Sequence, residues 1–179
     1  EGTTGITIDS IDTLTGAAAT NAGAVDIASN NSAAPWTPVR INGDVNTRST
    51  AGNGGNQQFA DPLVLTADVT FWSAGDATDG SIQFDQDIRD DAADTGGAAR
   101  ALTINAGVTN GVVTFGDGAD DSAGDTLGDR VDIDGDLSIT AAGGLVANAA
   151  TNGDPADSMT LRSADLALNS TDGTPVTVA

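Results

Sequence analysis

The segment "LVLTADVTF" at residues 63–71 contains two short alternating runs separated by a polar corner. In each run an apolar residue occupies every second position, which is the pattern of a β-strand with one buried face. The residues between the runs, Thr66, Ala67 and Asp68, are small or polar, as a tight turn requires. The segment therefore predicts two strands joined at a sharp corner.

The same template recurs along the chain at irregular intervals. The copies are "VRINGDV" at 39–45, "LTINAGV" at 102–108, "VDIDGDL" at 131–137 and the looser "ITIDSID" at 6–12 and "MTLRSADL" at 159–166. A third alternating run follows most copies, as in "VDI" at 25–27, "IQF" at 82–84, "VTF" at 113–115 and "VTV" at 176–178. Three strands per repeat predict an all-β fold, a parallel β-helix of about six irregular coils with Asp- and Gly-rich loops.

Stacked coils bring equivalent apolar residues into columns inside such a helix. One predicted column contains Ile8, Ile41, Leu65, Ile104, Ile133 and Leu161, and another contains Val45, Val69, Val108, Leu137 and Leu166. Because aromatic residues make up only 3% of the chain, we expect small and β-branched residues to fill the narrow interior without large aromatics. An antiparallel sandwich or jelly roll also alternates, but it would need more hairpin signals and a more aromatic core.

The composition limits the class of protein. The net charge is −20, from 26 acidic and 6 basic residues, and Glu1 is the only glutamate. Such a surface repels phosphate backbones, so nucleic acid is not an expected partner. Cysteine is absent, and no apolar run is long enough for a transmembrane segment. We expect one domain, with an N-terminal coil and an irregular cap or linker at residues 1–38 and the repeat region at 39–179.

Three consecutive segments carry a resemblance to a known family. They are "FADPLVLTADVTFWSAGDATDGSIQFDQDI" (59–88), "ALTINAGVTNGVVTFGDG" (101–118) and "VDIDGDLSITAAGG" (131–144). In this order they resemble the filamentous-haemagglutinin-like repeats of large bacterial surface and secreted proteins. The resemblance implies a right-handed parallel β-helix, export to the bacterial cell surface or the extracellular space, and a role in adhesion. The family's N-terminal secretion motif is not found in this sequence.

Aspartates form the most site-like feature of the sequence. Three alternate within "VDIDGDLSIT" (131–140), and several more crowd the preceding loop at 116–130. If the loop folds over the corner, the carboxylates could converge on calcium, which prefers oxygen ligands. Counted from Asp132, Leu137 occupies the sixth position, where an EF-hand loop has its glycine, and no glutamate lies downstream, so a structural corner is the alternative. The candidate calcium ligands are Asp117, Asp120, Asp121, Asp132, Asp134 and Asp136; no other cofactor is expected.

Catalysis is not expected, because the chain has no histidine, cysteine, lysine or tyrosine for proton transfer. The alternation that buries Phe71 directs Trp72 outward, where a loop covers it or where it stacks on a sugar ring or a neighbouring subunit. Trp36, between Pro35 and Pro38, is expected in a linker or end cap. The alternative function is therefore that of a carbohydrate-binding or carbohydrate-cleaving β-helix.

The function favoured by the sequence is that of an extracellular structural or adhesive protein without catalysis. We expect a rod or filament-forming surface segment whose partners are other coils. These coils belong to a longer chain or to copies that associate end to end. Glycans or the surface of a host or neighbouring cell are further candidate partners.

Overall fold

The computed structural model describes residues 6–13, 21–28, 38–90, 98–116, 130–147, 160–163, 166–169 and 177–178. These residues form three parallel sheets of six strands each, with no helix among them. Sheet 1 contains β1 (Thr7–Ile8), β4 (Val39–Ile41), β7 (Leu63–Leu65), β10 (Ile88–Asp90), β13 (Arg130–Asp132) and β16 (Thr160–Arg162). Sheet 2 contains β2 (Ile11–Asp12), β5 (Val45–Asn46), β8 (Val69–Trp72), β11 (Leu102–Asn105), β14 (Leu137–Thr140) and β17 (Leu166–Asn169). Sheet 3 contains β3 (Val25–Ile27), β6 (Gln57–Phe59), β9 (Ile82–Phe84), β12 (Val112–Phe115), β15 (Gly144–Ala147) and β18 (Thr177–Val178).

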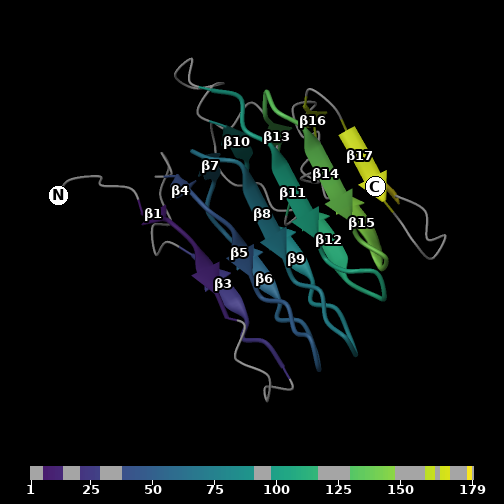
Figure 1. Ribbon diagram of the computed structural model, residues 1–179. Helices are drawn as coiled ribbons and strands as arrows, with labels where there is room; N and C mark the ends of the chain where they lie inside the picture. The colour runs from purple at the N-terminus through teal and green to yellow at the C-terminus, as the bar shows by residue number, and fades with distance from the viewer. Residues whose placement is uncertain are drawn as a thin grey trace.

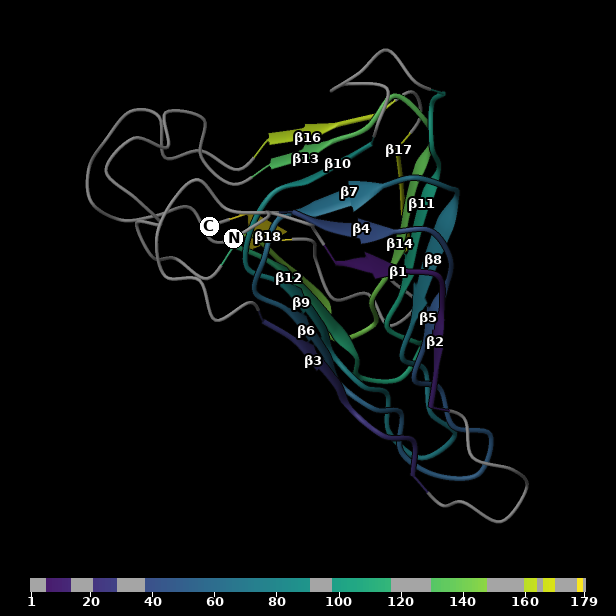
Figure 2. The same ribbon diagram turned by 90° about the vertical axis from the view of Figure 1, so that its left-hand side faces the viewer.

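The eighteen strands make six coils of a parallel β-helix, and each coil gives one strand to each sheet. Figure 1 shows the coils stacked in chain order from purple to yellow. Figure 2 looks along the stack from the β1 side, and the cross-section is a triangle. The chain runs clockwise around this triangle as it recedes from the viewer, so the helix is right-handed. The predicted fold is confirmed, and strands β1 to β3 from residues 1–38 form the first coil of the same stack.

The predicted inner columns are partly correct. Ile8 pairs with Ile41 and Ile41 pairs with Leu65 in sheet 1, and Leu137 pairs with Leu166 in sheet 2. Ile133 is fully buried in the core.

Other members of the predicted columns are wrong. Ile104 lies in sheet 2, between Phe71 and Ile139, and not in sheet 1. In that coil the sheet-1 strand is β10, and its Asp90 pairs with Leu65. Val108 is 63% exposed and lies outside every strand.

Two further pairings in the predicted columns are also shifted. Val45 pairs with Phe71, two residues beyond the predicted partner Val69. Leu161 pairs with Val131 and not with Ile133.

The four phenylalanines of the chain lie in the core, contrary to the expectation of an interior without large aromatics. Phe59, Phe84 and Phe115 stack in sheet 3 with centroid separations of 5.3 and 5.6 Å. Phe71 meets Phe59 and Phe84 edge-on from sheet 2, at 5.0 Å from each. Both geometries are favourable for aromatic pairs. Few aromatics are therefore present, but all the phenylalanines are concentrated in the middle coils.

Aspartate side chains link successive coils at the corners. Asp44 accepts a hydrogen bond from the Thr70 backbone N–H (2.8 Å), and Asp68 accepts one from Ala101 (3.0 Å). Asp79 accepts from the N–H groups of Gly75 and Asn110 at 2.9 and 3.1 Å. Thr70 lies in β8 ahead of the residues that pair with β5, and Ala101, Gly75 and Asn110 lie outside the strands, so these N–H groups need another acceptor. The short aspartate side chain suits this role, which accounts for part of the acidic composition.

Hydroxyl groups close the loops between sheets 2 and 3 in the first three coils. Thr13 donates to the Gly23 carbonyl (2.9 Å), Thr47 to Gly55 (2.6 Å) and Ser73 to Gly80 (2.7 Å). The three glycines lie above one another in the stack. A β-carbon on Gly55 would overlap the Gly23 carbonyl, and one on Gly80 would overlap the Gly55 carbonyl. Glycine is therefore needed here for the close approach of neighbouring coils.

We expect Gly80→Ala to lower the free energy of unfolding by about 1–3 kcal/mol, because the added methyl group meets backbone that cannot rotate away. Gly23→Ala is the matched control. Its β-carbon would lie 3.5 Å from Thr13 Cβ, an ordinary contact, so its effect should stay within about 0.5 kcal/mol. Urea denaturation of both variants measures the difference. Equal effects would contradict the packing proposed for this glycine column.

Candidate functional site

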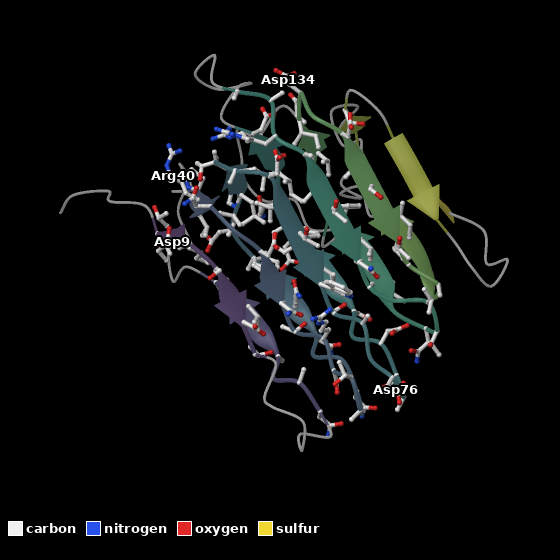
Figure 3. The ribbon with its side chains drawn as sticks, viewed as in Figure 1. Asp9, Arg40, Asp76 and Asp134 are labelled. Atoms are coloured by element: carbon white, nitrogen blue, oxygen red, sulfur yellow. The ribbon has the colours of Figure 1, made fainter. Side chains whose placement is uncertain are left out.

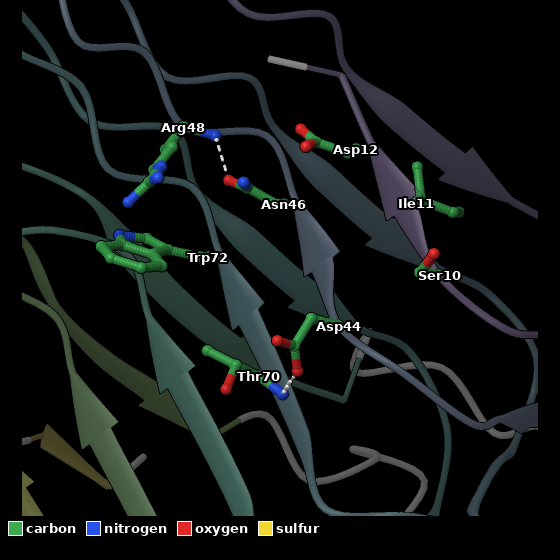
Figure 4. A pocket seen from close by; sticks show the side chains of 8 residues that line it. All are labelled: Ser10, Ile11, Asp12, Asp44, Asn46, Arg48, Thr70 and Trp72. Carbon is green, nitrogen blue, oxygen red and sulfur yellow. Dashed lines mark hydrogen bonds between the residues drawn. The ribbon is translucent and has the colours of Figure 1, made fainter.

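A pocket of about 400 Å³ lies on the outer face of sheet 2, across its first three strands. We call it the sheet-2 groove. Figure 4 shows Arg48 and Trp72 on one side, Ser10, Ile11 and Asp12 on the other, and Asn46 between them. Its lining residues are Ser10, Ile11, Asp12, Asp44, Asn46, Arg48, Thr70 and Trp72.

The strand register explains the shape of the groove. Asp12 pairs with Asn46, and Asn46 pairs with Trp72, so these three side chains form one row on the outer face of β2, β5 and β8. The middle member of the row, Asn46, is much smaller than Trp72. A shallow floor at Asn46 is therefore bounded by the larger side chains of Trp72 and Arg48.

Hydrogen bonds hold two of the polar lining groups in place. Asp44 Oδ1 accepts from the Thr70 backbone N–H at 2.8 Å, and Asn46 Oδ1 accepts from the Arg48 backbone N–H at 3.1 Å. Both bonds are drawn in Figure 4. Backbone on the neighbouring strand or loop thus orients the carboxylate and the amide, and such orientation favours a defined ligand geometry.

Trp72 lies on the outer face of the sheet, as the alternation predicts, and it is half-buried. The Arg48 guanidinium carbon lies 4.3 Å from the centre of the Trp72 ring, within the range of a cation–π contact. Trp72 Nε1 and Arg48 Nε are buried and have no hydrogen-bond partner within the described ranges. Both groups are donors, so this side of the groove contains two buried N–H groups that lack an acceptor.

Only three of the candidate calcium ligands, Asp132, Asp134 and Asp136, lie within the described residues. Asp117, Asp120 and Asp121 lie outside the described residues. Asp132 is the last residue of β13, while Asp134 and Asp136 are exposed in the corner before β14, where Figure 3 labels Asp134. In the described ranges no three acidic side chains are gathered as a metal site would require. Calcium binding therefore stays a prediction.

The corner position of Asp136 has a structural parallel. Asp136 immediately precedes the first residue of a sheet-2 strand, as Asp44 and Asp68 do in earlier coils. Those two carboxylates accept backbone N–H groups of the following coil. The Asp134 N–H donates to the Asp90 carboxylate at 2.8 Å, so this corner also joins coils. These contacts show a structural role for the backbone of this corner, and the metal-binding interpretation of its carboxylates stays a prediction.

The sequence identified Trp72 but missed its partners in the groove. Asp12 and Asn46 share its row, and a comparison of the outward positions of successive repeats could have found them. Arg48 follows β5 in a loop, where no repeat pattern marks it. Carboxylates, an amide, hydroxyls, a guanidinium and an indole ring together give the groove hydrogen-bond donors, acceptors and an aromatic surface.

Within the described ranges, no helix has the length and apolar character needed to cross a membrane. The resemblance of residues 59–144 to filamentous-haemagglutinin-like repeats has no independent support and stays a prediction. Comparison of the chain with protein-family models, curated proteins and solved structures found no match in any of the three.

Proposed function

We propose that the chain is a structural segment of an extracellular bacterial protein, a β-helix rod that acts in adhesion or in assembly at the cell surface. The observation that carries the proposal is the continuous parallel register of all six coils. Such a stack grows by adding coils of the same geometry, and each coil interacts chiefly with its neighbours. A rod of this kind supplies length and surface, and it needs no reaction centre.

The outer strands of the stack suit further pairing. In β3, the Val25 N–H donates to Asn56 O and the Ile27 carbonyl accepts from the Ala60 N–H, each at 2.9 Å. Since successive residues of a strand direct their backbone groups to opposite sides, the polar groups of Asp26 face away from β6. An edge of this kind is a template for another strand. The proposal is that such edges pair with further coils of the same chain or of another copy.

The test compares self-association of the wild-type chain with that of Asp26→Pro. Proline removes the outward N–H and spares the bonds of Val25 and Ile27 to coil 2. We expect end-to-end oligomers of the wild-type chain in sedimentation velocity and elongated particles in electron micrographs, with shorter species for Asp26→Pro.

Asp26→Ala is the control, because it removes the exposed carboxylate and keeps the edge N–H. It should associate at least as well as the wild-type chain. A wild-type chain that sediments strictly as a monomer at every concentration would count against the proposal.

A further inference from the structure

The two sides of the sheet-2 groove carry complementary hydrogen-bonding groups. Asp12 and Asp44 offer carboxylate acceptors, and Arg48 opposite them offers guanidinium donors. Asn46 between the two sides has both kinds of group. A ligand that suits this arrangement must donate and accept hydrogen bonds along its length. The hydroxyl groups of a sugar ring do both.

The unpaired donors on the Trp72 side point to the same chemistry. Buried N–H groups without an acceptor are uncommon in folded proteins, and here two of them, Trp72 Nε1 and Arg48 Nε, occur in adjacent side chains. A ligand oxygen that displaces the Arg48 side chain slightly would supply the acceptor. The apolar faces of sugar rings also pack well on an indole ring.

The charge of the groove argues against ionic ligands. Two carboxylates face one guanidinium in the groove, and the whole chain has a net charge of −20, so phosphorylated, sulfated or uronic-acid ligands are repelled. A cationic ligand would have to compete with Arg48, which already occupies the cation–π position 4.3 Å from the Trp72 ring centre. A neutral ligand avoids both penalties.

We propose that the sheet-2 groove binds a neutral oligosaccharide. Its volume of about 400 Å³ falls within the range of small-molecule sites and is large enough for a short run of sugar units. The part of the Trp72 side chain that Arg48 leaves exposed packs against a sugar ring, Arg48 donates to hydroxyl groups, and Asp12, Asp44 and Asn46 accept from them. This site adds a specific ligand to the structural role and does not depend on self-association.

Titration calorimetry with neutral tetrasaccharides tests the proposal: cellotetraose, xylotetraose, mannotetraose and chitotetraose. Tetragalacturonate and spermidine serve as the anionic and cationic comparators. We expect at least one neutral tetrasaccharide to bind the wild-type chain more tightly than either comparator. Trp72→Ala and Arg48→Ala should each weaken this binding by about tenfold or more.

Thr103→Ala is the matched control, because Thr103 lies on the outer face of sheet 2 in β11 and does not line the groove. It should bind like the wild-type chain. If Trp72→Ala does not fold, as judged by circular dichroism, Trp72→Phe retains a ring without the indole N–H and should show a smaller loss. The proposal is overturned if no neutral tetrasaccharide binds, if a charged comparator binds more tightly, or if the folded Trp72 variant binds unchanged.

Discussion

Phe84→Ala should lower the free energy of unfolding by about 3–5 kcal/mol, the largest effect we expect from any single substitution in this chain. The Phe84 side chain is fully buried and contacts three other rings, with centroid distances of 5.0 Å to Phe71, 5.3 Å to Phe59 and 5.6 Å to Phe115. Its removal leaves a cavity in the middle of the stack. Because these rings come from three successive coils, the loss also weakens the coupling between coils.

Guanidinium denaturation followed by circular dichroism measures this effect as a lower midpoint and, where the coils uncouple, a broader transition. Val108→Ala is the control, since Val108 is apolar but 63% exposed, and its effect should stay within about 0.5 kcal/mol. A Phe84→Ala variant as stable as the Val108→Ala variant would show that the phenylalanine column does not hold the coils together.

The fold was predictable because alternation, corner and alternation recur in a constant order. Most inward positions of the strands are apolar, so the sequence preserves the period of two even where loop lengths vary. The pairing of Ile8 with Ile41 and of Ile41 with Leu65 follows directly from aligning the repeats. Parallel stacking then follows, because residues at equivalent repeat positions lie over one another.

The predicted register is wrong where the fourth coil departs from the repeat. Its sheet-1 strand reads "IRD" at 88–90 and has a charged residue on each face. A template that requires apolar residues at the inward positions therefore does not match it. "LTINAGV" at 102–108 matches the template by composition, although its strand belongs to sheet 2. As a result, the template places Ile104 in the wrong sheet and the exposed Val108 in the core. Composition alone does not say which side of the triangle a strand forms.

The candidate site was less predictable than the fold, because it depends on neighbours in space. Trp72 stood out in the sequence as a rare aromatic at an outward position. Asp12 and Asn46 join it only through the pairing of β2, β5 and β8. The phenylalanine column also depends on neighbours in space. The overall aromatic content is low, but the strand register brings Phe59, Phe84 and Phe115 together in adjacent coils.

Asp90→Ala should have the second-largest effect, a loss of about 2–4 kcal/mol of unfolding free energy. Asp90 occupies an inner position of sheet 1 beside Leu65, and its side chain is fully buried. Its Oδ2 accepts the backbone N–H groups of Arg100 (3.1 Å) and Asp134 (2.8 Å). The carboxylate thus joins coil 4 to coil 5, and its removal leaves two backbone donors without their acceptor.

Two further variants distinguish the lost acceptor from a general effect of removing charge. Asp90→Asn keeps a carbonyl oxygen at the same place and should lose less stability than Asp90→Ala. Asp68→Ala removes an exposed carboxylate that accepts one backbone N–H, from Ala101, and should cost about 1 kcal/mol or less, because water can replace that bond. Urea denaturation of the three variants gives the ranking. If Asp90→Ala proved as mild as Asp68→Ala, the buried carboxylate would not be the link between these coils, and the fourth coil would have to be held by its strand pairing alone.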